Sequence, residues 1–353
     1  MKKLLLAFAL SLAAVPALAS EALPLYIGGR VVAKNGTYTY AWPGVWFEAR
    51  FNGDAVDVKA DDSLDNLYLY LDGAHKLTLT RPGKTTVSLK DLGPGPHTVR
   101  LEKASETQTG FGRFGGFFVA APAEALPAPQ YARRIEFIGD SYTVGYGVAS
   151  RGQTCSAADV DETTDTSRAF APAVAKHFGA AYRIHAFSGR GVVRNYDGIL
   201  PGETLPALYR FSLFDKSAGV PADGWVPDVL VIGLGTNDFS TALHAGEAWA
   251  TREALRADFV RQYAAFVKDL HTKFPAAHII LMASDRYDAE IAYGTDVTAD
   301  QLKAEGILDV ETLIFTGLDY QACHGHPSLN DEAVLTQLLV DRLRQLPDFA
   351  DGK

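Results

Sequence analysis

The pattern of hydrophobic residues changes near residue 130 and divides the chain into two parts. Between residues 20 and 119, short runs of β-forming residues alternate with turn sequences, and no helical stripe of apolar positions occurs. The runs include 46–51, 55–60 and 67–71, and the turns include Asn52-Gly53, Asp72-Gly73 and Pro82-Gly83. Such spacing is typical of an antiparallel meander. It predicts a small β-sandwich domain at 20–119, which we expect to be a jelly roll.

Residues 131–353 follow a different pattern, in which short apolar strands alternate with amphipathic helices. Strands are expected at 134–139, 182–187, 229–234 and 279–283, and helices at 168–178, 252–274 and 330–346. This order predicts an α/β domain with a doubly wound parallel sheet flanked by helices. Segments 198–224 and 287–317 are expected to be loops. Residues 120–130, rich in proline and alanine, have the composition of a linker.

The first 19 residues resemble a secretory signal peptide. A basic start at Lys2 and Lys3 precedes the apolar run Leu4 to Val15, and Ala17-Leu18-Ala19 has the form of a cleavage site. A membrane anchor would need about 20 apolar residues. We therefore expect a secreted or periplasmic protein that begins at Ser20.

Composition narrows the possible partners. Without Lys2 and Lys3, 31 basic residues face 42 acidic ones, a formal net charge of −11. This charge argues against nucleic acid and anionic membranes as partners and favours a neutral substrate such as a polysaccharide. The two cysteines, Cys155 and Cys323, are expected to form a disulfide in an oxidising compartment.

Polar residues follow three of the predicted strands. Ser141 follows 134–139, Ser188 to Gly191 follow 182–187, and Gly235 to Asp238 follow 229–234, while His326 precedes the last helix. Ligands of doubly wound sheets bind beyond the carboxyl ends of the strands, where these residues converge.

That set of side chains suits acyl transfer. Ser141 is the candidate nucleophile and His326 the base that takes its proton. The tetrahedral oxyanion could be met by the backbone N–H groups of Ser141 and Gly189 and by the side-chain amide of Asn237. Each motif alone would be unremarkable as a cap or a turn, but their order and placement make the set specific.

The sequence blocks GDSYTVGYG, SGRGVVRNY, GLGTNDFS and HPS resemble the signature blocks of the SGNH (GDSL) hydrolases over residues 131–346. With the preceding sandwich, the chain is most similar to carbohydrate esterase family two, which includes acetylxylan esterases. The resemblance implies a serine esterase that removes acetyl groups from xylan or glucomannan without a cofactor or metal. It also implies the dyad and oxyanion residues above, with Gly191 as the alternative glycine. Tyr196 and Trp225 are the candidates for stacking on the sugar.

One position departs from the superfamily pattern. The aspartate expected two or three residues before His326 is replaced by His324 and Cys323. Either a backbone carbonyl orients the imidazole, leaving a Ser141–His326 dyad, or a carboxylate comes from Asp319 or Asp285.

Other functions remain open on sequence alone. Cys323, His324 and His326 could bind zinc, although their spacing is cramped. The sandwich could bind carbohydrate through exposed aromatics such as Trp42, Trp46 and Tyr70, beside an inactive hydrolase domain. The same machinery could also act on peptidoglycan O-acetyl groups or lipid esters. A G-x-S-x-G elbow and a phosphate-binding loop are both missing from the sequence.

Overall fold

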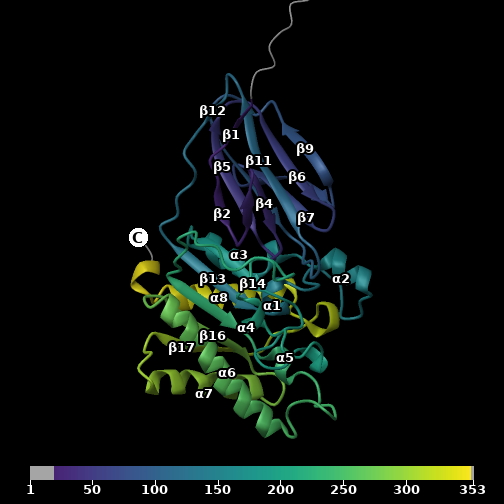
Figure 1. Cartoon of the computed structure of the whole chain (residues 1–353), viewed down its shortest axis with the longest axis vertical. Coiled ribbons are helices and arrows are strands. Elements are labelled where there is room, and N and C mark those ends of the chain that lie inside the picture. Colours follow the sequence, from purple (N-terminus) through teal and green to yellow (C-terminus); the bar gives the residue numbers. More distant parts are fainter. Residues whose placement is uncertain (1–19, 351–353) are drawn as a thin grey trace, which may run out of the picture.

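A computed structural model describes residues 20–350, and the predicted signal peptide lies outside this range. The β-sandwich is stacked on the α/β domain along the long axis of the molecule (Figure 1). Both parts of the predicted fold class are confirmed. Among residues 20–350, none of the helices combines the length and apolar character needed to span a membrane.

The sandwich consists of two antiparallel sheets. One has the order β3-β4-β11-β6-β9 with β1 paired to β11, and the other has the order β12-β5-β10-β7-β8 with β2 paired to β5. The strands are β1 (Ser20–Ala22), β2 (Tyr26–Gly28), β3 (Val32–Lys34), β4 (Thr37–Tyr40), β5 (Trp46–Asn52), β6 (Val56–Asp62), β7 (Asn66–Leu71), β8 (Ala74–Thr80), β9 (Gly83–Leu89), β10 (Pro96–Lys103), β11 (Gly112–Ala120) and β12 (Glu124–Ala125). Side chains in β6 and β7 alternate between the core and the surface, as the sequence pattern predicts.

The predicted linker needs correction at its centre. Glu124 and Ala125 form β12, which pairs with the end of β5 and is part of the sandwich. Proline-rich composition did not prevent this pairing, because β12 is an edge strand only two residues long.

The α/β domain has a five-stranded parallel sheet with the order β14-β13-β15-β16-β17. Its strands are β13 (Arg134–Gly139), β14 (Ala181–Ala186), β15 (Val229–Gly233), β16 (His278–Ser284) and β17 (Val310–Phe315). The helices are α1 (Ser141–Val144), α2 (Ala157–Thr163), α3 (Phe170–His177), α4 (Leu205–Leu208), α5 (Thr236–Phe239), α6 (Arg252–Lys273), α7 (Glu290–Ala304) and α8 (Leu329–Leu343), with 3-10 turns at Thr166–Arg168, Tyr196–Gly198, Cys323–Gly325 and Pro347–Phe349.

Helices cover both faces of this sheet. Alternate strand residues point to opposite faces, so that Ile135 and Phe137 pack in the cluster of α3 and α8, whereas Ile138 packs in the cluster of α6 and α7. The predicted loop at 287–317 is wrong, because it contains α7 and β17. Polar residues interrupt the apolar stripe of α7, although its inward residues Ile291 and Leu302 are buried.

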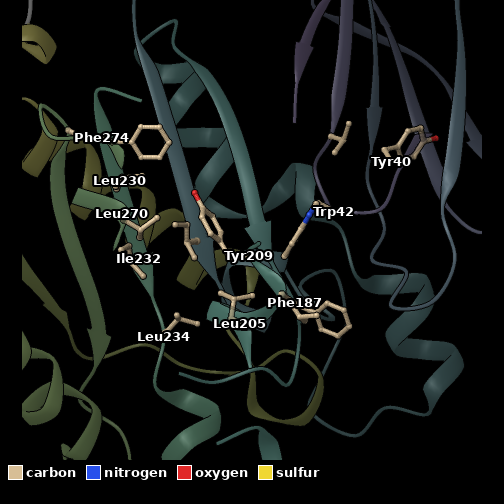
Figure 2. Close-up of a cluster of buried hydrophobic side chains, with 14 of the residues drawn as sticks. Tyr40, Trp42, Phe187, Leu205, Tyr209, Leu230, Ile232, Leu234, Leu270 and Phe274 are labelled. Atoms are coloured by element: carbon tan, nitrogen blue, oxygen red, sulfur yellow. The ribbon is translucent and has the colours of Figure 1, made fainter. Parts of the chain in front are cut away.

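The aromatics that the binding-protein alternative places on the surface are not exposed. Trp42 and Trp46 have 0% exposure and lie between the two domains, where their indole N–H groups donate to the carbonyls of Phe211 (3.1 Å) and Tyr182 (3.2 Å). Figure 2 shows Trp42 extending from the sandwich toward Phe187 and Tyr209 of the α/β domain. Tyr70 is half-buried beside α3. These rings join the two domains, and that expectation is therefore wrong.

Candidate active site

The carboxyl ends of the central strands bring together the residues that the sequence nominates. Ser141 begins α1 directly after β13, and His326 lies just before α8. The Nε2 atom of His326 is 2.8 Å from the Oγ atom of Ser141, within hydrogen-bonding distance. The candidate nucleophile and the candidate base therefore meet at the predicted edge of the sheet.

Local packing fixes the turn that presents Ser141. A Cβ atom on Gly139 would lie 2.0 Å from Oγ1 of Thr143, so only glycine fits where β13 meets α1. Asp140 caps the short helix by accepting from the N–H of Tyr142 (3.1 Å). Burial raises the pKa of Asp140 to about 7, although its hydrogen bonds oppose this shift.

A backbone carbonyl orients the imidazole. The Nδ1 atom of His326 is 2.8 Å from the carbonyl oxygen of Cys323. A carbonyl can only accept, so Nδ1 carries the proton and Nε2 is left to accept from Ser141. Burial lowers the pKa of His326 to about 4, which keeps the ring neutral at pH 7.

Neither candidate carboxylate reaches this ring. Asp319 accepts from the N–H of Gln321, while Asp285 is exposed beyond β16. The Cys323 carbonyl occupies the position next to Nδ1 where an orienting carboxylate would be needed. The alternative of an orienting aspartate is wrong.

Cys155 and Cys323 form a disulfide with their Cα atoms 5.5 Å apart. This bond also excludes the zinc alternative, because a disulfide sulfur cannot act as a thiolate ligand. His324 is already engaged by the Tyr146 hydroxyl (3.0 Å) and the Cys155 carbonyl (3.0 Å). Within the described residues, no group of three or more potential ligands is arranged to hold a metal ion.

Two backbone N–H groups are available for an oxyanion. Those of Ser141 and Gly189 donate to no other residue in the range 20–350. Gly189 has a φ of +85°, a conformation that favours glycine. The alternative, Gly191, is occupied, since its N–H donates to Oδ1 of Asn195 (3.2 Å).

The third candidate donor, Asn237, points into the same region from α5. Its side-chain nitrogen lies 2.9 Å from the carbonyl oxygen of Arg190 and 3.3 Å from Oδ2 of Asp140. An acyl oxygen would have to share or replace the longer of these two bonds.

Two further residues that support the site were not singled out from the sequence. Asp238, fully buried, accepts from the backbone N–H groups of residues 192–194 at 2.8–2.9 Å. Arg286, which follows β16, donates to the carbonyl oxygen of Gly325 (2.8 Å) beside His326. Their location after parallel strands was a usable signal, but their partners come from distant segments of the chain.

The two aromatic candidates for sugar binding lie at opposite edges of the sheet. Tyr196 is 51% exposed, and its N–H donates to the carbonyl oxygen of Gly189 (2.9 Å). Trp225 precedes β15, at the amino-terminal edge, where its indole N–H donates to Glu136 (2.9 Å) under the guanidinium of Arg183. Nearness in sequence to the motifs predicts Trp225 as a sugar-binding residue, but the structure does not bring it to Ser141. That prediction is wrong.

A hollow of about 930 Å³ lies elsewhere, between α6 and the segment around α4. Its lining includes Val193, Tyr209 and Phe266 but neither Ser141 nor His326. We place the chemistry at the dyad, since size without a nucleophile and a base supports no acyl transfer.

Known proteins match both parts of the chain. The carbohydrate esterase 2 N-terminal model matches residues 27–129, and the GDSL-like lipase/acylhydrolase model matches residues 137–334. An acetylxylan esterase / glucomannan deacetylase of Cellvibrio japonicus is 45% identical over 331 residues, covering 92% of each chain. The chain belongs to carbohydrate esterase family two, within the GDSL hydrolases.

Solved structures of related carbohydrate esterases have the same fold as this esterase. One, described as having divergent catalytic and non-catalytic binding functions in its active site, superposes with a TM-score of 0.88 at 44% identity, covering 93% of this chain and all of that one. A family two enzyme from Clostridium thermocellum in complex with cellohexaose has a TM-score of 0.80 at 24% identity, covering 92% and 99%. The second likeness concerns the fold alone.

Proposed function

We propose that this esterase is exported and removes O-acetyl groups from plant polysaccharides, with Ser141 as nucleophile and His326 as base. The contact of 2.8 Å between Ser141 Oγ and His326 Nε2 carries the proposal. The fixed tautomer of His326 supports it, because the bond from Nδ1 to the Cys323 carbonyl leaves Nε2 as the acceptor.

Acylation begins when Ser141 Oγ attacks the carbonyl carbon of the acetyl group. His326 Nε2 takes the hydroxyl proton as the new C–O bond forms. The negative charge then develops on the former carbonyl oxygen, where the N–H groups of Ser141 and Gly189 and the amide of Asn237 are its donors. When the tetrahedral intermediate collapses, the bond to the sugar oxygen breaks and the imidazolium returns the proton to that oxygen.

Deacylation repeats these steps with water. His326 takes a proton from the water molecule that attacks the acetyl-serine, and the proton then returns to Ser141 as acetate leaves. The neutral imidazole is the active form in both halves of the reaction. Its lowered pKa suits this role, since the base is not lost to protonation at neutral pH.

Three observations support a sugar ester as the substrate. The relative that is 45% identical is named as an acetylxylan esterase and glucomannan deacetylase. The exposed ring of Tyr196 stands next to the Gly189 turn, where a pyranose could stack on it. The excess of acidic residues fits a neutral polymer better than a phosphorylated one.

Export is proposed on the basis of the leader at residues 1–19. The disulfide between Cys155 and Cys323 supports it, because such bonds persist in oxidising compartments.

Acetate release from acetylated xylan and acetylated glucomannan tests the proposal directly. The protein beginning at Ser20 would be compared with Ser141→Ala, His326→Ala and, as a matched control, His75→Ala on the exposed β8 of the sandwich. Release by the parent and the control alone is expected.

Other results would change the assignment in distinct ways. Cleavage of 4-nitrophenyl acetate without release from either polymer would keep the dyad but move the substrate to another acyl ester. Parent-like turnover in Ser141→Ala or His326→Ala would remove that residue from the catalytic set. Inactivity of the parent on every ester would favour a carbohydrate-binding protein.

A further inference from the structure

The sandwich extends into the site through the loop between β10 and β11. On this loop, Glu106 and Gln108 both form hydrogen bonds with the same residue of the α/β domain, Ser188. Glu106 Oε1 accepts from the backbone N–H of Ser188 (2.8 Å), and Gln108 Nε2 donates to its carbonyl oxygen (3.1 Å). Two side chains of one domain thus hold both polar backbone groups of a residue in the other.

Ser188 directly precedes the glycine that offers an N–H to the oxyanion. The carbonyl that Gln108 holds belongs to the same peptide unit as the N–H of Gly189, and a peptide unit is planar. Fixing the direction of that carbonyl therefore fixes the direction of the N–H. Gly189 itself adopts a φ of +85°, a conformation that glycine accepts readily. Because glycine has no side chain, its own packing cannot fix the direction of this peptide.

The residues that follow Gly189 are held independently of the sandwich. Asp238 accepts from the backbone N–H groups of residues 192–194, so that segment is anchored within the α/β domain. Glu106 and Gln108 hold the near side from the other domain. Without them, the peptide unit between Ser188 and Gly189 would lose its bond from Gln108, and the peptide unit before it would lose its bond to Glu106.

We infer that Glu106 and Gln108 are positioning residues through which the sandwich aligns the Gly189 N–H with the developing oxyanion. The sandwich is then a working part of the catalytic site and not only an adjacent domain. This inference rests on the proposed acyl transfer at Ser141.

The environment of Glu106 is consistent with a fixed hydrogen-bonding role. Its side chain is half-buried between the domains, and burial raises the pKa of its carboxyl group while the Ser188 N–H opposes the rise. A carboxyl oxygen accepts a hydrogen bond in either protonation state. An amide oxygen could do the same, which makes glutamine the informative conservative replacement.

The test uses Glu106→Ala, Glu106→Gln and Gln108→Ala on two substrates, 4-nitrophenyl acetate and an acetylated xylo-oligosaccharide. Gln108 is exposed, so its truncation leaves the fold intact and keeps the test valid if Glu106→Ala unfolds. Tyr131→Phe is the matched control, because it removes another hydrogen bond between the domains, to Glu48 (2.6 Å), at the opposite edge of the sheet. Ser141→Ala on the same substrates checks the proposed function separately.

A misaligned oxyanion donor lowers the rate of the chemical step for every ester. We expect kcat to fall about 10- to 100-fold in Glu106→Ala, by the same factor on both substrates and with KM nearly unchanged. The fall in Gln108→Ala should be smaller, because Gln108 is exposed and water can replace its bond to the Ser188 carbonyl. Glu106→Gln should recover most of the loss, and Tyr131→Phe should match the parent.

Parent-like kcat in Glu106→Ala and Gln108→Ala would overturn the inference. A loss confined to the oligosaccharide and expressed in KM would also overturn it, because the two side chains would then be binding sugar. An active Ser141→Ala variant would instead refute the proposed function itself.

Discussion

Removal of the Cys155–Cys323 disulfide should lower the stability of the fold and disturb the position of His326, the proposed base. Cys323 supplies the carbonyl that holds Nδ1 of His326, and its side chain ties this segment to the loop that carries Cys155. A dyad without an orienting carboxylate depends on the position of one peptide group. The perturbation is either chemical reduction of the parent or the double variant Cys155→Ala/Cys323→Ala.

The size of the stability effect follows from the length of chain that the bond closes. The two cysteines are 168 residues apart in sequence. Closing a loop of this length lowers the conformational entropy of the unfolded chain, which stabilises the folded protein by about 5 kcal/mol at 25 °C. This is a large part of the roughly 5–15 kcal/mol by which folded proteins are stable, and we expect Tm to fall on the order of 10 °C.

The effect on catalysis should be smaller because other bonds hold the same segment. The N–H of His324 donates to the Gln153 carbonyl (2.8 Å), and its ring contacts the Cys155 carbonyl. We therefore expect the Cys323 carbonyl to shift without being lost, and kcat to fall about 10-fold with KM unchanged.

The assay compares the oxidised parent, the reduced parent and the double variant in acetate release and in thermal unfolding. A thiol titration must first find no free thiol in the oxidised protein after unfolding. Reduction changes no side chain except the two sulfurs, so it controls for the volume lost in the alanine variant. A reduced parent with unchanged kcat would refute the claim that the disulfide positions the base, and an unchanged Tm would refute the stability estimate.

Two further predictions concern the base and the oxyanion. Because burial lowers the pKa of His326 to about 4, the neutral base is lost only as pH falls through this value, and kcat/KM for acetate release should decline near pH 4; a decline at pH 6.5 would contradict the assignment. Asn237→Ala should lower kcat by roughly 10²- to 10³-fold, the effect of losing one oxyanion donor, and a parent-like rate would place the oxyanion elsewhere.

The fold and the positions of the candidate site residues could be predicted because their signals are local. The strand at Arg134–Gly139 was predicted with its observed bounds, and three others differ by one residue at one or both ends. The fifth strand, β17, was missed because its segment was expected to be a loop. Once the parallel sheet was inferred, its carboxyl edge gave the location of Ser141, Gly189 and Asn237. The choice between a dyad and a triad could not be made, since it depends on which atom faces Nδ1 of His326.

Aromatic residues were the least predictable part of the sequence. Trp42 and Trp46 are of the residue type that forms sugar-binding surfaces, yet both are fully buried between the domains. An aromatic ring buries a large apolar area wherever it is placed, so its type does not distinguish an interface from a binding platform. The prediction for Trp225 failed for a related reason. Trp225 is near a motif in sequence, but the length of a strand separates the amino-terminal edge of the sheet from the carboxyl edge that carries Ser141.

The contacts between domains have a consequence for how this esterase works. Buried tryptophans pack the sandwich against the α/β domain, and Glu106 on the loop between β10 and β11 joins the two domains at the catalytic edge. A displacement of the sandwich would therefore move the peptide that precedes Gly189, while leaving Ser141 and His326 in contact within the α/β domain. The contact between Ser141 and His326 involves the α/β domain alone, but the proposed alignment of the oxyanion donor requires both domains. Damage to the contacts of Glu106 and Gln108 with Ser188 should accordingly lower turnover before it disturbs the dyad.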